Sequence, residues 1–117
     1  MAINDGKDLN MNVIRKPATF ASGGTVSTPI FVGGQMIVGL DCGPALTSTT
    51  MTFLNSIDGG KTWASVENEN DGVAYSVMVE GGKYVHMQPP LTGLDMVRLV
   101  GGAAEAAARG VTLVLVP

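Results

Sequence analysis

Pairs of adjacent glycines divide this chain into short segments, and this limits what it can fold into. Four of the pairs stand at Gly33-Gly34, Gly59-Gly60, Gly81-Gly82 and Gly101-Gly102. Glycine adopts the positive φ of a tight turn without steric cost, so each pair is a turn signal. No segment between them shows the pattern of a long amphipathic helix. Several alternate apolar and polar residues, which is typical of strands that bury one face.

The alternating runs predict an all-β protein. They lie at 25–32, 35–41, 48–55, 62–67, 73–80, 83–88, 95–100 and 111–116. About eight short strands with Gly-rich turns favour an antiparallel two-sheet β-sandwich, and this number suits a jelly roll. The sequence leaves the strand order open. Pro29 interrupts the first run, so we expect an edge or bulged strand there.

Three runs carry more specific expectations. In 35–41, Met36, Val38 and Leu40 are expected to share one face. The segment 103–109 has high helix propensity but only seven residues, which favours one helical turn or an ordered loop. The run 111–116 is almost continuously apolar, which predicts a strand covered on both faces. Such a strand is either central in the sandwich or covered by a neighbouring subunit.

The length and the charge of the chain limit its possible domain organisation and partners. A chain of 117 residues predicts one domain, with 1–12 as a flexible polar N-terminal arm and 13–117 as the sandwich. Only 15% of residues are charged, which suits a protein covered by partners. The net charge of −3 argues against nucleic-acid binding. No apolar run is long enough to span a membrane, and no signal peptide is evident, so we expect a soluble protein made in a cytoplasm.

The best-defined local feature is the segment 56–63, Ser-Ile-Asp-Gly-Gly-Lys-Thr-Trp, between two strand-like runs. The Asp58 carboxylate can accept hydrogen bonds from backbone N–H groups downstream, and the glycines allow a tight reversal. We expect the Trp63 indole to cover the hairpin as a core anchor. The segment resembles the Asp box of sialidases and related propellers, in which it folds a hairpin and is not catalytic. The matching residues, predicted here as a structural hairpin, are Ser56, Asp58, Gly60, Thr62 and Trp63.

The sequence contains no recognisable catalytic, cofactor-binding or metal-binding motif, so we predict no enzyme, no cofactor and no metal site. His86 is the only histidine, and no nucleophile elbow or phosphate loop is present. Cys42 is alone, so it forms no internal disulfide, and we expect a structural thiol. The acidic turn from Glu67 to Asp71 imitates a calcium loop, but Met78 stands where that loop needs its final Glu. The few aromatic residues give little evidence of a sugar-stacking face.

A wider resemblance covers residues from about Thr28 to Pro117. The segments TPIFVGGQMIVGLDCGPAL, TSTTMTFLNSIDGGKTW, VAYSVMV, YVHMQPPLTGLDMVRLVGG and RGVTLVLVP follow one another in the chain. Their order is similar to that in small β-sandwich proteins of tailed bacteriophages, some of which resemble jelly-roll capsid cement, or decoration, proteins. The resemblance implies a structural virion protein on the outer surface of a capsid, made in the host cytoplasm, that cements capsomers without catalysis.

The partners implied are the major capsid protein and further copies of the chain, as a dimer or trimer, with no nucleic acid and no membrane. The alternative is a carbohydrate- or receptor-binding β-sandwich module of a phage tail, because the same fold supports both. A small hydrolase is a third hypothesis. Copy number per virion separates the first two.

Overall fold

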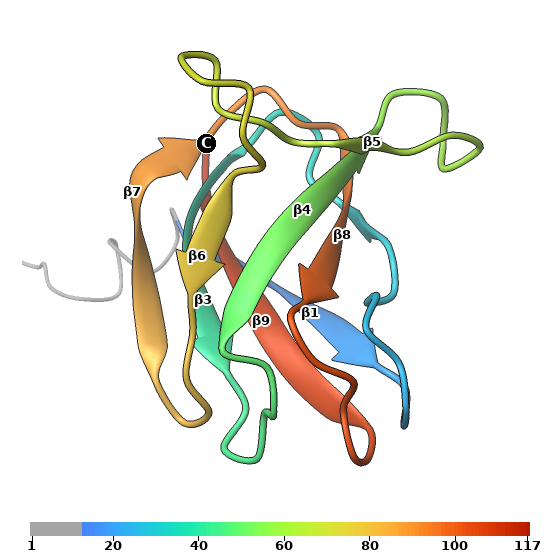
Figure 1. Cartoon of the computed structure of the whole chain (residues 1–117). Helices are drawn as coiled ribbons and strands as arrows, with labels where there is room; N and C mark the ends of the chain where they lie inside the picture. The colour runs from blue at the N-terminus through green and yellow to red at the C-terminus, as the bar shows by residue number, and fades with distance from the viewer. Residues whose placement is uncertain (1–12) are drawn as a thin grey trace, which may run out of the picture.

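The computed structural model describes residues 13–117, which form two antiparallel sheets packed face to face (Figure 1). The predicted arm, 1–12, lies outside the described residues. The first sheet has the order β1-β9-β3-β7, and the second has β2-β8-β4, with β5 and β6 both paired to β4. The strands are β1 (Ile14–Phe20), β2 (Ile30–Phe31), β3 (Met36–Cys42), β4 (Thr50–Ser56), β5 (Ala64–Ser65), β6 (Ser76–Met78), β7 (Tyr84–Leu91), β8 (Met96–Gly101) and β9 (Arg109–Val116).

The strand order is that of a jelly roll. Apart from the two-residue β5, the strands pair as nested partners: β1 with β9, β2 with β8, β3 with β7, and β4 with β6. This is the arrangement reached when one long antiparallel hairpin is rolled into two four-stranded sheets. The predicted all-β sandwich is therefore confirmed, and the topology that the sequence left open is now defined.

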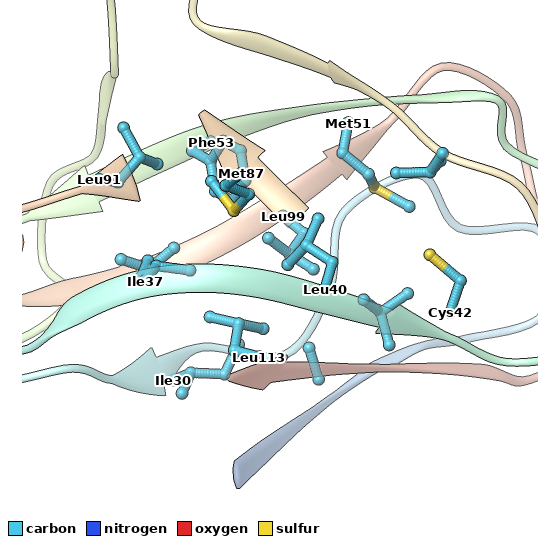
Figure 2. Packing of buried hydrophobic residues seen from close by; sticks show 14 of the residues in the cluster. Ile30, Ile37, Leu40, Cys42, Met51, Phe53, Met87, Leu91, Leu99 and Leu113 are labelled. Atoms are coloured by element: carbon cyan, nitrogen blue, oxygen red, sulfur yellow. The ribbon is translucent and has the colours of Figure 1, made fainter. Parts of the chain in front are cut away.

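The core fills the space between the two sheets with side chains from alternate strand positions. Ile37 and Leu40 from the first sheet point toward Phe53 and Leu99 from the second, as Figure 2 shows. The Phe53 and Tyr75 rings meet edge to face with centroids 5.8 Å apart. Each fully buried large apolar side chain contributes about 1.5–3 kcal/mol to the free energy of unfolding. Because alternate residues of each strand fill this core, the residues between them face outward.

The prediction that Met36, Val38 and Leu40 share one face of the run 35–41 is wrong, because Leu40 lies on the opposite face from the other two. The register of β3 against both neighbours shifts between Ile37 and Gly39, so the alternation is interrupted. Ile37 and Leu40 are fully buried, whereas Met36 and Val38 are half-buried. A β-bulge places two residues of one strand opposite one of its partner, and sequence alternation alone does not reveal it.

The apolar run at the C-terminus forms β9, which is an interior strand of the first sheet. A central position was one of the two alternatives predicted for this run. It lies between β1 and β3, and Val111, Leu113 and Leu115 are completely buried. Val114 and Val116 face outward and are only half-buried. Both edge strands of this sheet contain proline: Pro17 in β1, and Pro89 with Pro90 in β7.

The segment 103–109 is an ordered loop without a helical turn, and Glu105 explains why. Its carboxylate is 1% exposed and accepts hydrogen bonds from the N–H groups of Thr47 (2.8 Å) and Ser48 (3.0 Å) and from the Ser48 hydroxyl (3.0 Å). Its own backbone bonds to Gly23 and Gly24. Through its side chain and its backbone, this one residue therefore joins three loops at one end of the sandwich. Burial alone would raise the pKa of Glu105, but these hydrogen bonds hold its pKa below the usual range.

Glu105→Gln should lower the free energy of unfolding by about 1–3 kcal/mol, because the amide nitrogen would face N–H and O–H donors. The carboxylate with a depressed pKa stabilises the fold above its unfolded pKa of about 4.3, and this contribution is lost as the pH falls through the folded value. Urea melts of both proteins between neutral and acid pH should therefore converge at low pH. Glu69→Gln, in an exposed loop, is the matched control. An undiminished difference at acid pH would contradict this role of the charge.

Candidate protein-binding surface

The five residues of the Asp-box-like segment lie together in the turn that joins β4 to β5 (Figure 1). The buried Ser56 hydroxyl donates to Asp58 Oδ1 (2.7 Å) and accepts from the Gly60 N–H (2.8 Å). Asp58 accepts from the Thr62 hydroxyl (2.6 Å) and from the N–H groups of Thr62 (2.9 Å) and Lys61 (3.1 Å). Gly60 has a φ of 92°. The turn is therefore held by its own side chains and needs no ligand.

Electrostatics strengthen this turn. The hydroxyl and backbone hydrogen bonds from Thr62, with a further one from the Ser56 hydroxyl, lower the pKa of Asp58 to about 2. Asp58 is therefore ionised at neutral pH and cannot act as a general acid. The Ile57 side chain, 83% exposed, stands on this turn. The segment is a rigid structural element that presents an apolar side chain to solvent.

Trp63 lies outside the core, contrary to the expectation that it would be a core anchor. It is half-buried, and its indole N–H donates to the Gly60 carbonyl (3.1 Å). The Arg98 guanidinium lies 5.3 Å from the centroid of its ring. Arg98 belongs to β8, whose Val97 and Leu99 are buried, so Arg98 and the indole lie on the outward side of the second sheet. The ring covers a charged group, and the contact is a cation–π interaction.

The outward side of the second sheet, here the second-sheet face, carries very little charge. Strand register arranges its residues in rows: Phe31 beside Met96, Leu54 beside Arg98, and Thr52 between Val100 and Ser76. Met78 is 81% exposed and Phe31 is 56% exposed. The face consists of Phe31, Thr50, Thr52, Leu54, Trp63, Ser76, Met78, Met96, Arg98 and Val100, of which Arg98 is the sole charged residue.

Arg98 is incompletely satisfied in this face. Its Nε atom is buried and has no hydrogen-bond partner within residues 13–117. Buried donors are usually paired, so this unpaired nitrogen costs the fold some free energy. At the margin of the face, the Lys16 ammonium donates to the Phe31 carbonyl (2.7 Å) and lies 5.5 Å from its ring centroid.

A groove of about 400 Å³ separates β6 from β7 at the side of the sandwich. The Tyr75 hydroxyl donates to the Pro89 carbonyl across it (2.6 Å), and burial raises the pKa of this tyrosine. His86, the one histidine of the chain, lines the groove, and its Nε2 lies 2.9 Å from Gln88 Nε2. The hydrogen-bond partner of the His86 ring is therefore this amide, and not the Ser76 hydroxyl that also lines the groove.

The remaining candidate groups take structural positions. Cys42 is buried in the core, and burial raises the pKa of its thiol. In the acidic turn, Asp71 accepts a hydrogen bond from the Val73 N–H (3.0 Å). Within the described part of the chain, no three His, Cys, Asp or Glu residues form a group suited to a metal ion. Residues 13–117 also contain no helix of the length and apolarity that crossing a membrane requires.

The second-sheet face was not identified from the sequence. Its residues come from four strands, and only the register places them side by side. A signal was nevertheless present, since the outward positions of the run 48–55 are uncharged, 73–80 carries only Glu80 there, and 95–100 carries only Arg98. Combining these runs requires the jelly-roll strand order, which the sequence leaves open.

Comparisons with known proteins show a shared fold. No protein-family model matches the chain, and no curated protein matches it. The crystal structure of the SPBc2 prophage-derived protein YomS matches with a TM-score of 0.52 at 16% identity, covering 90% of this chain and 95% of that chain. A Yersinia pseudotuberculosis-derived mitogen (16% identity, covering 90% of this chain and 85% of that chain) has a TM-score of 0.36. A structure of Bacillus endospore appendage pili (13% identity, covering 90% and 88%) also has a TM-score of 0.36.

Gly60→Ala should lower the free energy of unfolding by about 1–2 kcal/mol, because an L-residue is strained at positive φ. Thermal or urea melts measure the change. Gly110→Ala is the matched control, since a Cβ there would meet only the Ala18 carbonyl oxygen, at 3.9 Å. Equal melts for Gly60→Ala and wild type would show that the turn relaxes without cost.

Proposed function

We propose that this chain is a structural virion protein that binds the outer surface of a bacteriophage capsid and cements capsomers. The second-sheet face supports this most directly. Protein interface cores are depleted in Lys, Glu and Asp and enriched in aromatic residues, Met and Arg. Phe31, Trp63, Met78, Met96 and Arg98 give this face that composition. A broad, weakly charged sheet face suits a protein that adds stability through buried area.

The origin of YomS is consistent with this proposal. That protein is described as prophage-derived, and it shares this fold over nearly its whole length. A fold does not fix a function, so the assignment to a phage particle depends on the surface and on the sequence resemblance as well.

The copy number in purified virions tests the role itself. A decoration protein is present in a fixed, high ratio to the major capsid protein, and quantitative gels of purified particles measure that ratio. A few copies per particle would contradict decoration and would instead indicate a module of the tail.

Thr52→Lys should abolish most capsid binding while leaving the fold intact. Thr52 is half-buried at the centre of the second-sheet face, so a lysine there can extend into solvent in the free protein. In a complex the ammonium would be desolvated without a partner, and binding should weaken by tenfold or more, as roughly 1.4 kcal/mol implies. Co-sedimentation with capsids lacking the protein measures this. Gln88→Lys, exposed on β7, is the control. Equal binding by Thr52→Lys and wild type would place the interface elsewhere.

We further propose that the chain associates as a dimer or trimer and that the arm reaches the major capsid protein. Residues 13–117 already supply all eight nested jelly-roll strands. Deleting 1–12 should therefore leave the melting temperature nearly unchanged but weaken capsid binding. Calorimetry and co-sedimentation measure the two effects, and analytical ultracentrifugation gives the oligomeric state. Unfolding of the truncated protein would contradict this role for the arm, as would full binding to capsids.

A further inference from the structure

The outward side of the first sheet, opposite the second-sheet face, contains a hollow of about 340 Å³ that crosses all four strands of that sheet. This volume lies within the range of small-molecule sites in proteins. The side chains around it differ in chemistry: one is aromatic, one cationic, one anionic and one a hydroxyl. We name it the Tyr84 hollow, and its lining residues are Val13, Arg15, Asp41, Tyr84, Thr112 and Val114.

Tyr84 lies on the floor of this hollow. The hydroxyl end of its ring covers Gly39 of the neighbouring strand, where an added Cβ would overlap the ring atoms. Gly39 is consequently buried even though it lies on an outer face. The Tyr84 side chain is nevertheless 52% exposed. The strand therefore supports the ring from below, and the rest of the ring is open to solvent as an apolar platform.

The groups around the ring suit a neutral polyhydroxylated ligand. A guanidinium only donates hydrogen bonds, a carboxylate only accepts them, and a hydroxyl does both. Arg15, Asp41 and Thr112 supply one of each. A sugar ring presents hydroxyl groups that donate and accept at its edge and an apolar C–H face that can lie against an aromatic ring. Arg15 and Asp41 together carry no net charge, so the hollow has no overall attraction for a ligand of either sign.

A second hollow extends the first along β3 and β9. It has a volume of about 300 Å³ and shares Asp41 and Thr112 with the Tyr84 hollow. Its other lining residues are Cys42, Gly43, Pro44 and Gly110. Two connected hollows on one sheet face fit a ligand of at least two linked rings better than a single one.

We infer that the Tyr84 hollow and its extension bind a neutral oligosaccharide. Tyr84 stacks against the C–H face of one sugar ring, Arg15 donates to its hydroxyls, and Asp41 accepts from hydroxyls of two adjoining rings. The site lies on the side of the sandwich away from the second-sheet face. A protein attached to a particle through that face would hold the sugar site outward. The inference concerns the isolated protein and does not depend on the proposed capsid role.

The experiment uses the full chain without capsids. An array of neutral glycans serves as the screen, and ¹⁵N-labelled protein is then titrated with chitotriose, cellotriose, maltotriose and any array hit. Wild type should bind at least one of these, with amide shifts concentrated at Asp41, Tyr84 and Thr112. Tyr84→Ala and Asp41→Ala should each raise Kd about tenfold or more, whereas Tyr84→Phe should keep most of the affinity because the ring remains.

His86→Ala is the matched control, because His86 is exposed on the same strand but lines the groove toward β6. Its Kd should equal that of wild type. Unchanged amide spectra away from the hollow show that each variant is folded, and Asp41→Ala provides the test if Tyr84→Ala is not. The inference is overturned if no array glycan and no titrated sugar binds up to about 10 mM. It is also overturned if Tyr84→Ala and Asp41→Ala bind as well as wild type does.

Discussion

The insertion of β9 between β1 and β3 is the pairing on which the rest of the structure depends. β9 is the last strand of the chain, yet it bonds to neighbours on both edges and buries Val111, Leu113 and Leu115 completely. Without it, the first sheet would separate into β1 and the β3–β7 pair, and one wall of the core would be lost. The nested pairing also joins residues from opposite ends of the chain, so folding has to close long loops before the core forms.

The alternation of apolar and polar residues predicted the strand positions well for strands that are paired on both edges. The runs 95–100 and 111–116 correspond closely to β8 (Met96–Gly101) and β9 (Arg109–Val116), because each has a neighbour on both edges and buries alternate side chains. The run 25–32 shrinks to the two residues of β2. There the buried Ser27 hydroxyl bonds to the Leu99 N–H (2.9 Å) and replaces part of the backbone pairing. β7 continues through Pro89 and Pro90 because an edge strand needs few donors.

The candidate surfaces were less predictable than the strands. The residues of the Asp-box-like turn are close in sequence, so their pattern could be read directly. The second-sheet face and the Tyr84 hollow each combine side chains from four strands, and their composition is visible only once the register is known. The role of Glu105 could not be predicted for a related reason. The alanines around it indicate helix propensity, whereas its carboxylate bonds to Thr47 and Ser48, almost sixty residues earlier in the chain.

Carboxylates organise the loops at both ends of the sandwich in the same physical way. Asp58 accepts backbone N–H groups in the turn after β4, and Glu105 does so among the loops at the opposite end. In both cases the acceptor bonds lower the pKa of the acid.

The prolines in the edge strands of the first sheet limit how copies of this protein can join. An exposed strand edge is a template onto which another chain can add, and repeated addition gives open-ended fibrils. Pro17 in β1, and Pro89 with Pro90 in β7, each remove a backbone donor from such an edge. Growth by strand addition is therefore disfavoured along both borders of the sheet, and assembly is directed to the faces and loops. A protein with these borders can be present at high local concentration on a scaffold and still form a layer whose extent the scaffold decides.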